Sequence, residues 1–447
     1  DLTDVFTIQA ALAEEITTAL KASLTAGERT LLARRPTENQ AAYDLYLRAR
    51  VLDQNLSIAS TREAYESVIA LYDQAAAADP KFALPHVQAS ILHGTLYWFG
   101  SLDATPARRA RVEAELEAAK RLAPDAPETY LAQGSFDYTC RNDWAKSIVE
   151  YRKAEAGLPN DAQLQYRIGI AHRRLGQMEE AQRRFEISVT LNPNDLNAVA
   201  TYFDNLLAMR HYRQLVAEIV RFEAIFPAER RLQTSRLRAL YELDGNRSAF
   251  RRDMAALPPA AADPHGLQAA FAAAMDVGDL AAAEKVLEDP RMTGINDAGR
   301  AINYPVELAR ASLAWLRGRP EDARRFADEA IANIRSRKWA PRQEPGAQMG
   351  IAHAEAFAGR HEEALRDARS ALADQVARDV YAGATMQDDL GRILVVCNQR
   401  EEALAVLRTY LAGIGGPTPN AIRYDPIWSR LKDDPRFEEI LRSAKPL

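Results

Sequence analysis

Apolar and small side chains recur at every third or fourth position along most of the chain, which is the spacing of one face of an α-helix. In the clearest stretch, Ala181, Phe185 and Ser188 follow one another at spacings of four and three residues, so that they share a helical face. Gly176 precedes this stretch and Asn192-Pro193 ends it, and both are residues at which helices stop. The pattern predicts short helices that are joined by tight turns into antiparallel pairs.

Prolines and glycines repeat these turns at a fixed period. Pro159, Pro193 and Pro227 are 34 residues apart, and Pro124 lies 35 residues before Pro159. A second turn signature, glycine followed five residues later by alanine, is found at Gly278-Ala283, Gly318-Ala323 and Gly359-Ala364. A period of 34 residues resembles the tetratricopeptide repeat (TPR) family. The resemblance implies an all-α fold, a tetratricopeptide-type α-solenoid in which antiparallel helix pairs form a right-handed superhelix.

The strength of the repeat signal divides the chain into segments. We predict an N-terminal helix and linker over 1–39, divergent helix pairs with an insertion over 40–127, a TPR array over 128–261, a second and more divergent array over 262–412, and a linker with a capping helix over 413–447. Pro80 and Pro124 are 44 residues apart, so the insertion adds about ten residues to one period and is expected to include Tyr97 to Pro106. Pro258-Pro259 is expected to mark a bend or a break between two superhelical halves.

Both ends of the chain carry a narrower similarity. It rests on the segments Asp4–Gln9, Glu14–Ile16, Arg34–Thr37 and Ala42–Arg48, and on Tyr424–Trp428 and Asp433–Phe437. These segments resemble bacterial proteins in which a TolB-like domain is joined to a C-terminal TPR array, with a class III adenylate cyclase, a winged-helix DNA-binding regulator or a protein kinase as the N-terminal partner. The resemblance implies a sensory or scaffolding C-terminal half. Because the chain begins with Asp1 and not with methionine, we expect a fragment of a longer or processed protein.

Composition narrows the classes of partner. The 57 basic and 62 acidic residues give a net charge of −5, whereas nucleic acid favours a basic surface, so we expect no nucleic-acid binding by this chain. No apolar run approaches the roughly 18 residues of a transmembrane segment. The two cysteines, Cys140 and Cys397, indicate neither a disulfide framework nor a zinc site and are expected to be buried free thiols. The compartment is open: cytoplasmic or periplasmic, depending on the N-terminal region.

Motifs for chemistry are missing from the sequence. It contains no phosphate-binding loop, no His-Glu-x-x-His zinc helix, no Gly-x-Ser-x-Gly nucleophile elbow and no kinase signature set. We therefore predict no catalytic residue, no cofactor, no metal ion and no enzyme activity in this chain, although an effector such as adenylate cyclase may precede it in a longer protein. The acidic pairs Asp388-Asp389 and Asp433-Asp434 are interpreted as helix-start or surface residues. The following aromatic residues are expected to fill the core: Trp144, Tyr151, Phe185, Tyr202 and Phe222.

The remaining candidate site is the concave wall, which the first helix of each pair builds in such arrays. We expect it to bind a protein or peptide through Phe136, Tyr166, Ile170, Arg173, Arg174, Asp204 and Leu207. Arg173 and Arg174 are predicted to engage an acidic segment; in the alternative, they are solvated or pair with nearby acids such as Glu179 and Glu180. The carboxylate-clamp pattern of the TPR family is not supported, because Ala132, Phe136 and Arg167 stand where it places lysine, arginine or asparagine.

Three functional hypotheses follow from these observations. The first is a protein- or peptide-binding scaffold that forms the sensor half of a bacterial signalling protein. The second is a structural array that mediates self-association, with its groove filled by its own termini or by a sister subunit of a homo-oligomer. The third is an enzyme whose site escapes motif search.

Overall fold

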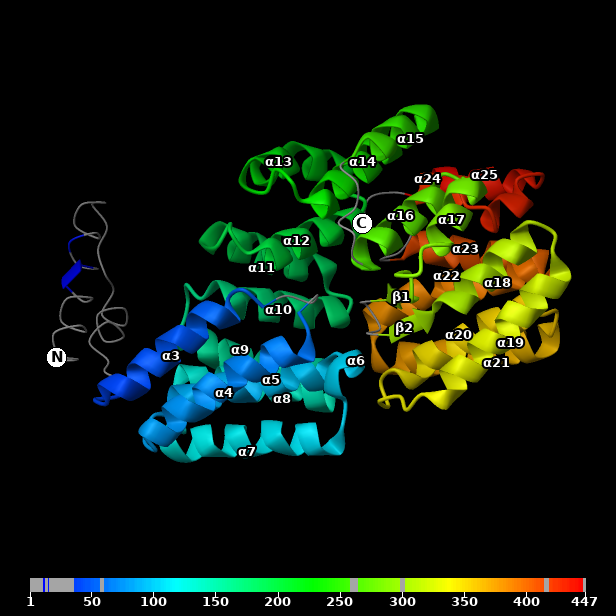
Figure 1. The fold of residues 1–447 in the computed structure, drawn as a ribbon. Coiled ribbons are helices and arrows are strands. Elements are labelled where there is room, and N and C mark those ends of the chain that lie inside the picture. Colours follow the sequence, from blue (N-terminus) through cyan, green and yellow to red (C-terminus); the bar gives the residue numbers. More distant parts are fainter. Residues whose placement is uncertain are drawn as a thin grey trace. The chain divides into compact units, whose positions relative to one another are not determined.

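The computed structural model describes residues 11–12, 15, 36–56, 60–257, 264–297, 302–413 and 418–444 (Figure 1). Helices account for nearly all of these residues, which confirms the predicted all-α class. The described residues belong to two compact units, one that ends at Ala171 and one that begins at His172. The predictions for most of segment 1–39, for Pro258-Pro259 and for most of the glycine-rich linker after Gly413 lie outside the described residues.

The first unit is a succession of helix pairs. Its elements are α3 (Gln40–Asp53) with α4 (Arg62–Ala78), α5 (Ala83–Trp98) with α7 (Pro106–Leu122), α8 (Pro127–Phe136) with α9 (Trp144–Gly157), and the greater part of α10 (Ala162–Arg174). The two helices of each pair pack against each other, and each pair also packs against the next. A short helix, α6 (Gly100–Asp103), lies within the segment predicted as an insertion.

The second unit continues the pairing. Its helices are α11 (Met178–Leu191), α12 (Leu196–Ala208), α13 (Tyr212–Ile225), α14 (Arg230–Asp244), α15 (Arg247–Ala256), α16 (Pro264–Asp276), α17 (Leu280–Leu287), α18 (Val306–Leu316), α19 (Pro320–Ser336), α20 (Glu344–Phe357), α21 (His361–Arg378), α22 (Val380–Val396), α23 (Arg400–Ala412), α24 (Pro419–Tyr424) and α25 (Pro435–Ser443). Neighbouring helices from α18 to α23 pack side by side in chain order, as Figure 1 shows. This tandem packing is the tetratricopeptide-type arrangement that the sequence predicted.

The turns within the pairs follow the predicted signature. Gly176, Gly278, Gly318 and Gly359 all have a positive φ, between 66° and 82°, as the C-terminal caps of their helices. The alanine five residues after each of them is completely buried. Asn398 takes the same left-handed conformation, with φ 61°, in the turn between α22 and α23.

The predicted core residues are buried. Trp144, Tyr151, Phe185, Tyr202 and Phe222 are each less than a tenth exposed. Cys140 and Cys397 are buried free thiols, as expected, and burial raises the pKa of each thiol to about 11. Neither thiol is therefore a reactive thiolate at neutral pH.

Two elements were not predicted from the sequence. Residues Asp137–Arg141 form a π-helical turn that ends at Asn142, whose φ is 55°. The strands β1 (Gly294–Asp297) and β2 (Ile302–Pro305) form an antiparallel hairpin in which Ile295 pairs with Tyr304. Both elements interrupt the plain succession of helix pairs, and four-residue strands give too short an alternating pattern to be read from the sequence.

The first test of the helix-pair register concerns Gly134. A Cβ atom at this position would lie 2.5 Å from Cδ1 of Tyr151, because the Tyr151 ring of α9 packs directly on Gly134 of α8. Gly134→Leu is therefore expected to destabilise the first unit by about 1–3 kcal/mol through overpacking. Urea unfolding followed by circular dichroism measures this loss. Ala110→Leu, on the exposed face of α7, is the control, and an equal stability of both variants would contradict the packing.

The C-terminal segment closes the array through a buried polar cluster. Nε and Nη1 of Arg392 lie 2.6 Å from Asp388 and 2.7 Å from Asp425, and Trp428 donates its Nε1–H to Asp388 at 2.8 Å. The prediction that Asp388 is a surface or helix-start residue is wrong, because this carboxylate is buried inside α22 as the partner of an arginine and a tryptophan. Asp433 does lie at the surface, and Asp434 is a helix-start residue that caps α25.

Candidate binding surface

The predicted wall residues of the first unit differ in exposure. Phe136 is only 4% exposed and packs into the core with Val87 and Ile91, while the Arg141 guanidinium lies 4.7 Å from its ring centroid. The expectation that Phe136 faces an open groove is therefore corrected: neighbouring helices and Arg141 cover its ring. Tyr166 and Ile170 are partly exposed on one side of α10, one turn apart.

Arg174, at the end of the same helix, is buried. Its Nη1 lies 2.8 Å from Oδ2 of Asp379, and the two side chains are 6% and 7% exposed. Asp379 also caps α22, since its Oδ1 accepts the backbone N–H of Ala382 at 2.9 Å. One carboxylate thus starts a helix and neutralises an arginine that is 205 residues away in the sequence.

Arg173 lies between two aromatic rings. Its guanidinium carbon is 5.6 Å from the ring centroid of Phe185 and 5.0 Å from that of Tyr381, distances at which a cation attracts a π-system. Tyr381 in turn packs against an apolar cluster formed by Met178, Ala208 and Met209. Asp379 and Tyr381, at the start of α22, together contact the two arginines that the sequence predicted as ligand-binding; we call these four residues the α10–α22 contact.

Glu180 does not take part in this contact. It accepts hydrogen bonds from Arg183 and Arg184 on its own helix, and these partners, opposed by a smaller effect of burial, lower its pKa. The nearby acid that was considered as a partner for Arg173 or Arg174 is therefore engaged elsewhere. The acid that does pair with Arg174 comes from a distant part of the chain, which sequence spacing does not reveal.

The last two predicted residues lie on α12. Asp204 is about two-fifths exposed and forms an ion pair of 2.5 Å with Arg231 of α14. An exposed ion pair of this kind contributes little to stability. Leu207 is partly exposed. Of the seven predicted residues, only Arg173 and Arg174 are brought together by the structure in one contact with another segment of the chain.

Sequence reasoning missed the residues that complete this contact. Asp379 carries a recognisable signal as a helix cap, because it stands directly before the apolar start of α22. Nothing in the local sequence indicates that it faces Arg174.

The described ranges hold no group of three or more histidine, cysteine, aspartate or glutamate side chains in a geometry suited to a metal ion. Within the same ranges, every helix is either too short or too polar to cross a lipid bilayer.

Comparison with known proteins gives matches among solved structures but none among family models or curated sequences. Among solved structures, PilF of Pseudomonas aeruginosa is similar at 16% identity and a TM-score of 0.34, over 46% of this chain and 90% of PilF. PilW, described as a widely conserved type IV pilus biogenesis factor, is similar at 16% identity and a TM-score of 0.30, over 56% of this chain and 91% of PilW.

Proposed function

We propose that this chain is a non-catalytic scaffold and sensor module of a bacterial signalling protein, and that it binds an acidic segment of a partner protein on a wall of the second unit that includes Arg173, Arg174 and α12. The α10–α22 contact is the observation that carries this proposal. Within the chain, the Asp379 carboxylate binds Arg174, and the ring of Tyr381, two residues after Asp379, lies beside Arg173. We infer that a partner protein is recognised in the same way.

The chemistry of this contact defines the partner. A buried arginine holds a carboxylate with charge-assisted hydrogen bonds, and an aromatic ring beside a second arginine adds a cation–π attraction. The partner is therefore a segment with aspartate or glutamate followed two residues later by tyrosine or another aromatic residue. Because α22 already occupies the wall, such a segment binds only when the start of α22 is released. Intramolecular competition of this kind acts at an effective concentration of about millimolar.

The test uses a labelled peptide with the sequence of Asp379–Asp388 and the whole chain as receptor. The double variant Asp379→Asn/Tyr381→Ala frees the wall and keeps a helix cap, since asparagine caps about as well as aspartate. We expect this variant to bind the peptide, and the unchanged chain to bind it at least tenfold more weakly. Fluorescence anisotropy measures both affinities.

A further pair of substitutions locates the binding. Arg173→Glu/Arg174→Glu, added to the freed variant, is expected to weaken peptide binding roughly tenfold or more, because a charge-assisted hydrogen bond contributes about 1.5–3 kcal/mol. Arg213→Glu/Arg221→Glu in the same background changes the charge equally on exposed positions of α13 and is expected to leave binding unchanged. Equal losses from both pairs would contradict a site on this wall.

The α10–α22 contact also supports the second hypothesis, a structural array, because the contact can be a permanent part of the fold. If α22 serves only to close the wall, the freed variant binds no peptide and is merely less stable. Sedimentation equilibrium over a range of concentrations then tests for self-association, the remaining role proposed for such an array.

A further inference from the structure

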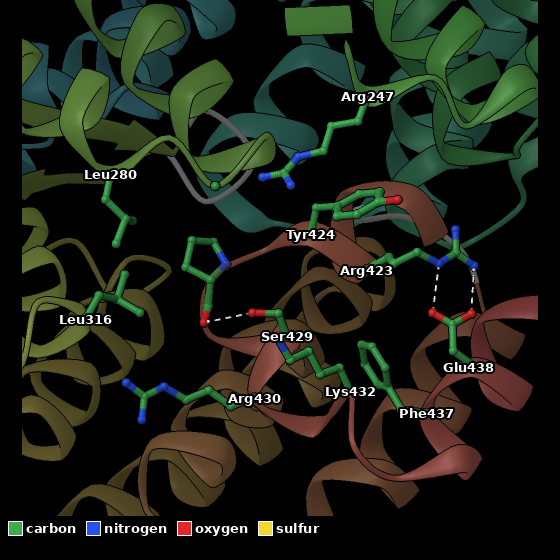
Figure 2. A pocket seen from close by; sticks show the side chains of 12 residues that line it. Arg247, Leu280, Leu316, Arg423, Tyr424, Ser429, Arg430, Lys432, Phe437 and Glu438 are labelled. Atoms are coloured by element: carbon green, nitrogen blue, oxygen red, sulfur yellow. Dashed lines mark hydrogen bonds and ion pairs between the residues drawn. The ribbon is translucent and has the colours of Figure 1, made fainter.

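A pocket of about 550 Å³ lies in the second unit, away from the α10–α22 contact. Its walls come from the start of α15, the turn between α16 and α17, the end of α18, and the C-terminal segment from α24 to α25 (Figure 2). Pockets of about 300–1,000 Å³ are of the size that holds small organic ligands. The proposed function makes no use of this pocket.

The lining of the pocket is strongly basic. Arg247, Arg423, Arg430 and Lys432 line it, against a single carboxylate, that of Glu438. Glu438 is already paired with Arg423, whose Nε and Nη2 lie 2.9 Å and 3.2 Å from its two oxygens. The other three cations therefore give the pocket an excess of positive charge. In a concave site with low-dielectric walls, such an excess attracts an anion more strongly than on an open surface.

These three cations have no carboxylate partner among the described residues. Arg430 lies over the ring of Trp315, 4.0 Å from its centroid, and Arg247 lies 4.7 Å from the ring centroid of Tyr424 and donates to the carbonyl of Val277. The Nε of Arg247 is buried without a hydrogen-bond partner.

The surrounding arginines behave differently. Arg392 is held by Asp388 and Asp425, Arg400 by Asp433 and Asp434, and Arg436 by Glu401 and Asp434. Carboxylates thus neutralise these three arginines locally, whereas, within the described ranges, Arg247, Arg430 and Lys432 line the pocket without one.

Apolar side chains form the rest of the lining. Figure 2 shows Leu280 and Leu316 on one side of the pocket, opposite Arg423 and Glu438. Tyr424, which is partly exposed, adds aromatic surface. A fully hydrated inorganic anion gains nothing from such surfaces, whereas a ligand with an apolar body buries them.

We propose that this pocket binds a small organic anion, in which a carboxylate or phosphate group is joined to an apolar or aromatic body. Arg247, Arg430 and Lys432 hold the anionic group, and the leucines and Tyr424 contact the body. Because the walls come from α15 to α18 and from the C-terminal segment, a bound ligand links these parts and stabilises the second unit by mass action.

Isothermal titration calorimetry of the full chain at 150 mM salt tests the proposal with three probes: phenyl phosphate, 3-phenylpropionate and pyrophosphate. We expect at least one of the two aromatic anions to bind, and to bind more tightly than pyrophosphate. Phenyl phosphate alone identifies a phosphate site, and 3-phenylpropionate alone identifies a carboxylate site. Tighter binding of pyrophosphate would overturn the role of the apolar lining, and binding of no probe would overturn the proposal.

Variants place the binding in the pocket. Arg430→Gln/Lys432→Gln is expected to weaken the bound aromatic anion at least tenfold. The matched control, Arg213→Gln/Lys338→Gln, removes the same charge from exposed positions elsewhere in the second unit and is expected to leave the affinity unchanged. Melting without ligand, followed by circular dichroism, establishes that both variants are folded. Equal affinities of a folded pocket variant and the unchanged chain would overturn the assignment.

Discussion

Arg392→Met is expected to destabilise the second unit by about 3–5 kcal/mol, because it leaves two buried carboxylates without their cation. Asp388 and Asp425, the two partners of Arg392, have side chains that are only 10% and 8% exposed. Water therefore does not replace the lost arginine, and the two acids face each other as like charges. Urea unfolding, followed by tryptophan fluorescence and circular dichroism, measures the change.

Two controls distinguish the effect of breaking this buried cluster from the effect of removing an exposed arginine. Arg400→Met removes an exposed arginine that pairs with Asp433 at the surface, and it is expected to have no measurable effect. Asp388→Asn/Arg392→Met/Asp425→Asn removes the whole set of charges, while asparagine still accepts the N–H groups that Asp388 and Asp425 accept. This triple variant is expected to regain part of the lost stability, and a triple variant as unstable as Arg392→Met would contradict the argument.

The buried cluster also fixes the C-terminal segment of the chain to α22. Trp428 packs on Gly391 so closely that a Cβ atom there would collide with its indole ring, and the backbone N–H groups of Ile427 and Trp428 bind Asp425. The segment Tyr424–Trp428 thus has a structural role here. It packs against α22 through Trp428, which lies in the same apolar cluster as residues of α23.

The repetitive part of the fold was predictable because its signals are local. A left-handed glycine at a helix end, a proline at a helix start and small residues three or four apart act within one helix pair, so that each can be read without knowing the rest of the structure. Gly176, Gly318 and Gly359 confirm this directly.

Contacts between distant parts of the chain were not predictable in the same way. Arg174 meets Asp379 across 205 residues, and Glu242 accepts the backbone N–H groups of Asn420 and Ala421 at the start of α24. Such contacts depend on how many helix pairs lie between the two residues and on the angle between successive pairs. The sequence of a single helix pair specifies neither quantity. The sequence therefore identified Arg173 and Arg174 as residues of interest but not what they contact.

Asp388 illustrates the same limit. An acidic pair on a helix is usually solvated, and that is how this pair was interpreted. Its burial follows from two residues beyond its own helix, Asp425 and Trp428, and only the packing of the C-terminal segment brings them to it.

A second large effect is expected from pH, in the first unit. His93 is 2% exposed, and its Nδ1 lies 2.6 Å from Nη1 of Arg108. Since arginine only donates hydrogen bonds, Nδ1 of His93 is the acceptor, and the imidazole is neutral with its proton on Nε2. Burial first, and then the charge of Arg108, lower the pKa of His93 to about 4.

The sign of the effect follows from comparing the two states. In the unfolded chain the imidazole has a pKa of about 6.5, so between pH 6.5 and pH 4 the unfolded state binds more protons than the folded state. The free energy of unfolding therefore falls as the pH falls through this window, by about 3 kcal/mol over its whole width. The carboxylates around Arg108 titrate lower. Burial acts to raise the pKa of Glu66 and Asp103, but the hydrogen bonds and charge of Arg108, with a hydrogen bond from Thr105 to Asp103, together outweigh it and lower both pKa values.

The measurement uses the upper part of the window, from pH 6.5 to pH 5, where these carboxylates stay ionised. The unchanged chain is expected to lose about 2 kcal/mol of stability there, measured by hydrogen exchange of the slowest amides of α5 and α7 after correction for intrinsic rates. His93→Gln keeps an acceptor for Arg108 but does not titrate, so its protection is expected to be nearly independent of pH. His361→Gln, at an exposed position of α21 in the second unit, is the control and is expected to retain the full dependence. A His93→Gln variant with the slope of the unchanged chain would show that another group carries the pH dependence and that His93 does not titrate as its burial beside Arg108 requires.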